Sequence, residues 1–312
     1  MTTAWMFPGQ GSQRPAMADS LGAAPELFSV ARDVLPFDLE PACTTDPRPT
    51  WTTRHLQPAM FIVCVAAAQA LEARDQRPDA LVGHSLGELA ALVAAGALDF
   101  EDGLVLVAAR GRAMDTAARR EPGGMAAVLG LDLEAIAGIC AEIGGVWPAN
   151  LNSPGQIAIS GRDDSLAQAA ERCRSAGAGR VVRLEVPIAA HSPLMAPAAD
   201  EVRAVLDTIE LQPLDCPLYS VVDARPHTDP GEIRELLIEG IVSPVRFWEA
   251  VQAAHADGAG RFIEVGPGTV LSGLVRRTLT TMGGVELASV SSDEDADRVA
   301  GVVGAVASGS QP

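Results

Sequence analysis

The segment Gly83-His84-Ser85-Leu86-Gly87 has the residue types that a serine nucleophile requires. A Gly-x-Ser-x-Gly sequence between a strand and a helix forms a sharp turn that exposes the serine hydroxyl. The glycines are needed because the turn leaves little room beside the serine, and the first N–H groups of the helix favour developing negative charge. The pentapeptide alone also fits a chance match, since glycine and serine are common. It predicts covalent catalysis through Ser85 when both flanking elements are present.

A serine hydroxyl needs a base to activate it, and the sequence offers several histidines. These are His55, His84, His191, His227 and His255. His84 adjoins the serine, but a side chain next to the tip of a sharp turn is expected to point away from it. His191 follows a predicted strand and turn and precedes Ser192-Pro193 at the start of a helix. Spacing gives His191 only a slight preference, and each of these histidines is also compatible with an ordinary surface or core position.

The elements around Ser85 alternate between strands and helices. Short apolar runs predict strands at 4–7, 79–82 and 261–265, and helical composition marks 58–74, 86–95 and 99–114. This alternation favours an α/β fold with a mostly parallel sheet. From residue 301 the chain is rich in Ala, Gly and Ser, which predicts a frayed tail.

A different order of elements occupies the middle of the chain. Between residues 123 and 186 the strand and helix signals follow the order β-α-β-β-α-β, which is that of a ferredoxin-like unit. We interpret residues 123–186 as a small ferredoxin-like domain inserted into a large hydrolase-like domain made of residues 1–122 and 187–312. The active site is then expected in the cleft between them.

Composition excludes several classes of function. The formal net charge is −17, and all 23 basic residues are arginine. Nucleic-acid binding requires a basic surface, and an acidic one disfavours anionic membranes. The N-terminus does not resemble a signal peptide, and no 18-residue apolar run is present. Five widely spaced cysteines, including Cys64 in an apolar run, predict neither a disulfide framework nor a zinc site. A cytoplasmic protein is expected.

Six motifs in order resemble the malonyl-CoA:acyl-carrier-protein transacylase family and the acyltransferase domains of polyketide synthases. The resemblance covers roughly residues 4 to 280. The motifs are Phe7 to Gln13 (Phe-Pro-Gly-Gln-Gly-Ser-Gln), Gly83 to Glu88 (Gly-His-Ser-Leu-Gly-Glu), Arg110 to Met114, Asn150 to Gln156, His191 to Met195 and Glu264 to Gly268.

The resemblance implies a role for each matching residue. Ser85 would attack a thioester with His191 as general base, and Gln10 together with the N–H of Leu86 would form the oxyanion hole. Arg110 would pair with the free carboxylate of the acyl group. The same motifs make further substrate contacts candidates at Gly9, His84, Met114 and Asn152. The implied reaction passes a malonyl-type group from acyl-CoA to an acyl carrier protein or a polyketide synthase carrier domain. It involves no metal or redox cofactor, and a monomer is expected.

Two positions depart from the family pattern. Gly240 stands where a glutamine is common, so only its backbone carbonyl can orient the His191 imidazole. Ala190 precedes the histidine, where polyketide acyltransferases often have Phe for malonyl or Ser for methylmalonyl donors. The small side chain at Ala190 leaves room for an α-methyl or α-ethyl malonyl donor, although it also permits malonyl itself.

Two other classes of function remain open. A hydrolase that clears acyl groups from carrier proteins would use the same Ser85 and His191, but it gains nothing from a carboxylate clamp at Arg110. A non-catalytic module that docks carrier proteins would not need this set of residues. Carrier proteins are usually acidic, so we expect a local arginine patch near the cleft. The candidates are Arg119-Arg120, Arg180 with Arg183, and Arg276-Arg277.

Overall fold

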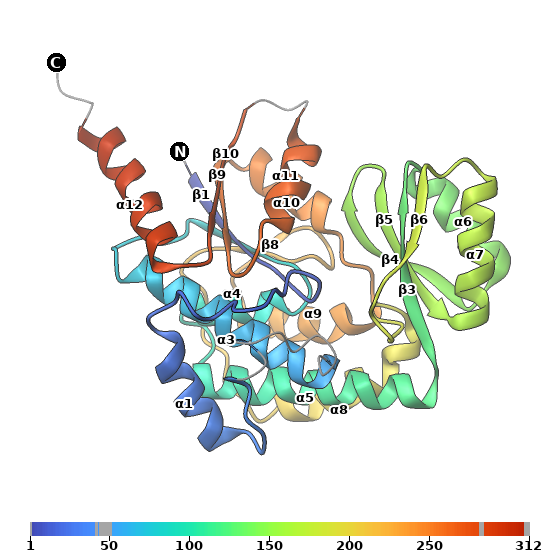
Figure 1. Ribbon diagram of the computed structural model, residues 1–312, viewed down its shortest axis with the longest axis horizontal. Helices are drawn as coiled ribbons and strands as arrows, with labels where there is room; N and C mark the ends of the chain where they lie inside the picture. The colour runs from blue at the N-terminus through green and yellow to red at the C-terminus, as the bar shows by residue number, and fades with distance from the viewer. Residues whose placement is uncertain (1, 41–42, 44–51, 281–283, 309–312) are drawn as a thin grey trace.

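The computed structural model describes residues 2–40, 43, 52–280 and 284–308 (Figure 1). Its larger part, the six-stranded region, is built on a sheet with the order β10-β9-β1-β2-β7-β8, parallel throughout except at β7–β8. This confirms the predicted α/β fold. The strands are β1 (Thr2–Phe7), β2 (Ala80–Gly83), β7 (Leu218–Tyr219), β8 (Pro226–His227), β9 (Ala259–Val265) and β10 (Glu286–Val290).

Helices cover both faces of this sheet because the side chains of its strands alternate between two apolar cores. In β1, Trp5 and Phe7 pack into the core that contains most of α3, whereas Ala4 and Met6 pack into the core shared with α10 and α11. The helices of the region are α1 (Ala24–Val34), α3 (Thr53–Glu72), α4 (Gly87–Ala94), α5 (Phe100–Arg120), α8 (Ala196–Leu206), α9 (Pro230–Val242), α10 (Phe247–Ala256), α11 (Val270–Leu279) and α12 (Asp293–Ser308), with a short 3₁₀ helix η2 (Pro193–Met195).

The four-stranded region lies to one side of the larger part (Figure 1) and has a core of its own. Its antiparallel sheet has the order β4-β5-β3-β6, which is the ferredoxin-like arrangement of the six elements. The elements are β3 (Gly123–Leu129), α6 (Leu133–Ile143), β4 (Val146–Ser153), β5 (Gln156–Arg162), α7 (Asp163–Ser175) and β6 (Arg180–Arg183). The division of the chain at 122/123 and 186/187 stays our interpretation.

A pair of backbone hydrogen bonds joins the two regions next to the predicted site. Leu151 N–H donates to the Val245 carbonyl, and Val245 N–H donates to the Ala149 carbonyl, both at 2.8 Å. Strand β4 of the small sheet is therefore fixed to the segment between α9 and α10. None of the helices in the described ranges is long and apolar enough to cross a membrane.

Two helices differ from the sequence prediction. Helix α3 begins at Thr53, so Pro58 lies inside it, because the Thr52 carbonyl already accepts the N–H groups of His55 and Leu56. Helix α5 continues to Arg120, one turn and a half beyond the predicted end. Its apolar positions Ala117 and Ala118 stay buried, and Pro122 then prevents further continuation.

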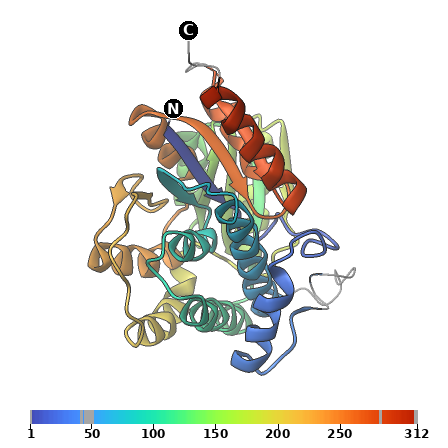
Figure 2. The ribbon, with the colours of Figure 1, turned by 90° about the vertical axis from the view of Figure 1, so that its left-hand side faces the viewer.

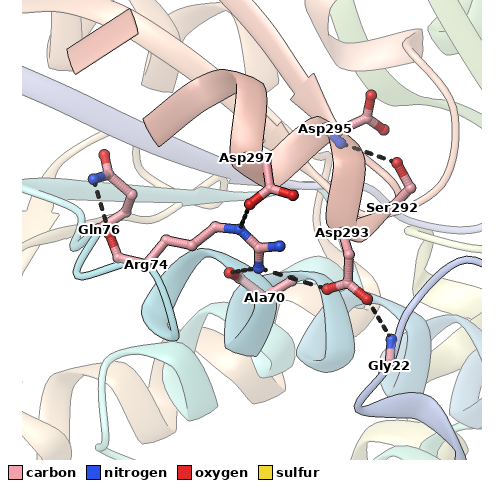
Figure 3. Close-up of polar contacts among 8 residues, drawn as sticks. All are labelled: Gly22, Ala70, Arg74, Gln76, Ser292, Asp293, Asp295 and Asp297. Carbon is pink, nitrogen blue, oxygen red and sulfur yellow. Dashed lines mark hydrogen bonds and ion pairs between the residues drawn. The ribbon is translucent and has the colours of Figure 1, made fainter. Parts of the chain in front are cut away.

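The frayed tail predicted from residue 301 is wrong up to Ser308, because α12 continues to that residue. Helix α12 lies on the outside of the six-stranded region (Figure 2), where its first turn is held by the C-terminal end of α3 (Figure 3). Arg74 Nε contacts Asp297 at 2.6 Å, and its Nη1 donates to the Ala70 carbonyl at 2.7 Å and lies 3.6 Å from Asp293. Asp293 also accepts the Gly22 N–H at 2.8 Å.

Candidate active site

Ser85 stands at a strained turn between β2 and α4. Its φ is +58°, a left-handed conformation that non-glycine residues rarely adopt. The flanking glycines are sterically required: a Cβ on Gly83 would lie 2.2 Å from the Glu88 nitrogen, and one on Gly87 would lie 2.0 Å from the Phe7 carbonyl oxygen. The strand–turn–helix context predicted for a nucleophile is therefore present, and the turn is braced against β1.

The opening turn of α4 follows Ser85 directly in the chain. Leu86 is the N-cap residue of α4, and the next two N–H groups are used within the turn, Gly87 by the His84 carbonyl at 3.1 Å and Glu88 by the Ser85 carbonyl at 3.2 Å. The Leu86 N–H belongs to the opening turn, where donors lack partners inside the helix. Gln10, from the loop after β1, lines the same pocket as Ser85.

His191 is the histidine that the fold brings to the serine. Its Nε2 lies 2.9 Å from Ser85 Oγ, and its Nδ1 lies 2.7 Å from the Gly240 carbonyl. Because a carbonyl only accepts, Nδ1 carries the proton and Nε2 is left to accept from the serine hydroxyl. Burial, with a contribution from Arg110, lowers the pKa of His191 to about 3, so the imidazole is a neutral base at neutral pH.

The other histidines have different partners. His55 Nδ1 lies 2.9 Å from the Thr52 hydroxyl, and His255 Nδ1 lies 2.8 Å from the Ala259 carbonyl. His227 contacts Asp223 and Glu232. Hydrogen bonding to the serine thus separates His191 from the alternatives that spacing left open.

Arg110 projects from α5 into the interior and reaches the nucleophile. Its side chain is buried, with Nη2 donating to Ser85 Oγ at 3.0 Å and Nη1 donating to Gln57 Oε1 at 2.7 Å. Burial lowers the pKa of Arg110 to about 10, which still leaves it charged at neutral pH. Within the described ranges no carboxylate lies within ion-pair distance of Arg110. The guanidinium is therefore able to take a carboxylate from a ligand.

Gln57 is a functional candidate that the sequence reasoning missed. It lies on α3 and is 2% exposed, accepts from Arg110 and donates to Met114 Sδ at 3.4 Å. These two hydrogen bonds hold the Arg110 guanidinium in place and connect Met114, one turn further along α5, to the same cluster. The sequence carried no clear signal for it, because Gln57 follows the polar Arg54 and His55 and stands before the apolar run of the helix.

The main pocket lies between the two regions and meets Ser85 from the side of β4. From the four-stranded region and the segment after β6 it receives Met125, Asn150, Leu184 and Val186, and Ala190 lies beside the catalytic pair. Asn150 Oδ1 is buried without a hydrogen-bond partner. It is a second residue that the sequence reasoning did not single out, although it begins one of the six motifs.

A smaller recess lies on the other side of Ser85 and Arg110. Apolar side chains from α4, α5, α8 and α9 enclose it: Leu89, Leu106, Val202, Leu206 and Leu237. Gly240 lies at its wall, and a Cβ there would approach Val222 Cγ2 at 3.3 Å. The residue whose carbonyl orients His191 thus also leaves this recess open.

The remaining predicted contacts support the wall of the pocket. His84 points away from the serine hydroxyl, as expected, with Nε2 3.0 Å from Asn152 Oδ1 and its ring 5.4 Å from that of Phe247. A Cβ on Gly9 would lie 2.5 Å from the His84 carbonyl oxygen, so the loop after β1 approaches the turn only with glycine there. His84 and Met114 line the pocket, whereas Gly9 and Asn152 contact His84 from outside that lining.

The chain is similar in sequence to one family of known proteins. Residues 4–304 match the acyl transferase domain family. The chain is 41% identical to the malonyl CoA-acyl carrier protein transacylase of Bacillus subtilis over 88% of this chain and 89% of that protein, and 38% identical to that of Escherichia coli over 89% and 93%.

Solved structures agree with the sequence matches. The malonyl CoA-acyl carrier protein transacylase of Coxiella burnetii superposes with a TM-score of 0.92 at 34% identity, covering 96% of this chain and 97% of that one. A malonyl-transacylase solved in complex with a type II polyketide synthase acyl-carrier protein gives a TM-score of 0.90 at 35% identity, covering 95% and 98%.

Proposed function

The chain belongs to the acyl transferase domain family, and from that premise we propose that it transfers a malonyl group from malonyl-CoA to the thiol of an acyl carrier protein. The observation that carries the proposal is the pair of hydrogen bonds made by the Ser85 hydroxyl. One hydroxyl donates to a neutral, oriented imidazole and accepts from a buried guanidinium that lacks a carboxylate partner in the described chain. The nucleophilic oxygen is therefore in direct contact with the guanidinium that would bind a carboxylate.

In the first half-reaction Ser85 Oγ attacks the thioester carbonyl of malonyl-CoA while its proton moves to His191 Nε2. The Leu86 N–H and Gln10 stabilise the oxyanion. Collapse of the tetrahedral intermediate breaks the C–S bond, and the departing CoA thiol takes the proton back from His191. The product is a malonyl ester on Ser85 and free CoA.

In the second half-reaction the phosphopantetheine thiol of the carrier protein enters the same pocket. His191 accepts its proton, the sulfur attacks the ester carbonyl, and Ser85 leaves with that proton. The chemistry uses only these side chains, so treatment with a chelator is expected to leave turnover unchanged.

The donor is the second part of the proposal. A malonyl carboxylate pairing with Arg110 orients the carbonyl over Ser85, and an acetyl group has nothing to place there. Hydrolysis is disfavoured on the same ground, since a general editing enzyme does not need the clamp. Two observations favour an α-methyl or α-ethyl malonyl donor as a second candidate: Ala190 is small, and the recess beside Gly240 is lined mostly by apolar side chains.

The partner is an acyl carrier protein, and an acidic partner requires basic residues on this acidic chain. Arg276 and Arg277 both lie in the last turn of α11. Arg277 donates to Gln156 of β5, whereas the Arg276 side chain makes no hydrogen bond or ion pair within the described residues. We propose that Arg276 faces the carrier. Arg276→Glu is then expected to raise the KM for carrier protein several-fold and to leave acylation by malonyl-CoA unchanged. We further propose a cytoplasmic monomer.

Intact mass spectrometry after brief exposure to acyl-CoAs tests the function. The panel contains acetyl, malonyl, methylmalonyl and ethylmalonyl donors, with Ser85→Ala as the control. A malonyl adduct on Ser85 that persists until carrier protein is added supports the transferase. An adduct that decays in water without a thiol acceptor indicates the hydrolase, and a preference for a substituted donor establishes the second candidate.

A further inference from the structure

One buried carboxylate near the nucleophile has no part in the proposed mechanism. Glu88 lies one turn along α4 from Ser85 and is 4% exposed. Its Oε1 accepts the Val221 N–H at 3.0 Å, and it also accepts from the Ser220 hydroxyl. These contacts hold the carboxylate against the loop after β7, at the floor of the recess behind Ser85.

Glu88 and Arg110 are a separated pair of opposite charges. Among the described residues that line the pocket and the recess, Glu88 is the one carboxylate and Arg110 is the one permanent cation. They do not form an ion pair within 4 Å, because Arg110 is turned toward Gln57 and Ser85. The buried guanidinium nevertheless favours the ionised form of Glu88 through space.

A second anion changes this balance. When the acyl carboxylate pairs with Arg110, its negative charge lies closer to the guanidinium than that of Glu88. The repulsion between the ligand carboxylate and Glu88 then offsets the attraction that Arg110 exerts on Glu88. This change favours the protonated carboxylic acid.

We propose that Glu88 is a positioning residue that takes up one proton from solvent when the malonyl carboxylate binds Arg110, so that the buried site holds one cation and one anion before and after loading. The inference rests on the proposed function, since it requires a carboxylated acyl group. A protonated Glu88 still accepts from the Val221 N–H, so the loop after β7 keeps its place.

The expected pH dependence follows from the free enzyme. Burial raises the pKa of Glu88 to about 7, with Arg110 lowering it and Asp223 raising it. The neighbouring His84 and His191 stay neutral in this range because burial lowers the pKa of both. Below about pH 7 Glu88 is protonated in both states and malonyl affinity is constant. Above it the free enzyme loses the proton that the complex keeps, so affinity falls by up to about tenfold per pH unit.

Titration calorimetry of the full-length Ser85→Ala variant with malonyl-CoA tests this, because binding is then measured without acyl transfer. Proton uptake is read from the dependence of the heat on the ionisation enthalpy of the buffer at pH 7.5–8. We expect uptake in Ser85→Ala and its loss in Ser85→Ala with Glu88→Gln, an isostere that still accepts from Val221. The CoA phosphate titrates equally in both proteins, and acetyl-CoA is expected to cause no Glu88-dependent uptake.

The outcomes are distinct. Equal uptake in the two proteins overturns this inference alone, whereas failure of Ser85→Ala to bind malonyl-CoA overturns the proposed donor and this inference with it. If Glu88→Gln does not fold, Asp223→Asn replaces it. Removing that negative charge lowers the pKa of Glu88, so the decline in malonyl affinity is expected to begin at lower pH, and an unchanged onset contradicts the proposal.

Discussion

The two walls of the cleft contribute different kinds of residue. The six-stranded region provides the nucleophile, the base, the guanidinium and Gln57, each fixed by hydrogen bonds. The four-stranded region and the segment after β6 provide neutral side chains such as Met125, Asn150 and Val186. Reacting groups need sub-ångström positioning, which a braced parallel sheet supplies, whereas the opposite wall needs only shape and a few polar contacts. Substitutions on the two walls should therefore have different kinetic signatures.

The largest effect is expected from the catalytic pair. Ser85→Ala and His191→Ala should each lower turnover by at least about 10⁴-fold, because nucleophile and base act as one unit. Combining them should therefore cost little more than either alone. Steady-state transfer to carrier protein measures this, with melting temperature as the check on folding. An additive loss in the double variant would show that the two residues act independently.

Arg110→Gln should slow acylation by malonyl-CoA much more than acylation by acetyl-CoA. Truncating a buried charged partner costs roughly 2–5 kcal/mol, so acylation by malonyl-CoA is expected to fall by about thirtyfold to several thousandfold. The slow acylation by acetyl-CoA should change by no more than a few-fold. Arg112→Gln, at an exposed position of the same helix, is the matched control. Equal losses with both donors would indicate that Arg110 acts through its hydrogen bond to Ser85 and not by binding the carboxylate of the donor.

A change on the opposite wall should be milder and appear in KM. Asn150→Ala removes a buried acceptor that has no protein partner, and a neutral hydrogen bond contributes about 1 kcal/mol, which is roughly fivefold in KM at constant kcat. Gln168→Ala, on the exposed face of α7, serves as the control. A fall in kcat without a change in KM would place Asn150 with the reacting groups and remove the contrast between the walls.

The last prediction concerns stability and not kinetics. The pKa of Glu88 is raised by burial from 4.5 to about 7, so between these values the unfolded chain has released a proton that the folded chain retains. The wild type should therefore lose stability from this group as pH rises through that window. Glu88→Gln removes this loss, so the difference in melting temperature between variant and wild type should grow in favour of the variant from pH 4.5 to 7. A constant difference would contradict the assignment.

Much of the fold and the chemical centre could be predicted because they depend on local signals. The turn around Ser85 is encoded by glycines that the packing demands, and alternating strands and helices predicted the parallel sheet. Gln57 could not be placed in the site because its function depends on a contact with Arg110, 53 positions away. The course of α12 was missed because the helix starts before residue 301, where Arg74 and the core hold it, and then continues into a segment whose small residues favour a loose tail.

The acceptor that orients His191 is a main-chain carbonyl in the last turns of α9. The orientation of the base therefore does not depend on which side chain stands at position 240. A side-chain acceptor can be removed by a single substitution. Here any residue compatible with the helix presents the same backbone oxygen at position 240. A Cβ at that position would instead point toward Val222 in the wall of the recess. Substitutions at position 240 can thus change the shape of the space beside the acyl group while the hydrogen bond to His191 is kept. Donor preference can therefore change at this position without loss of the catalytic base.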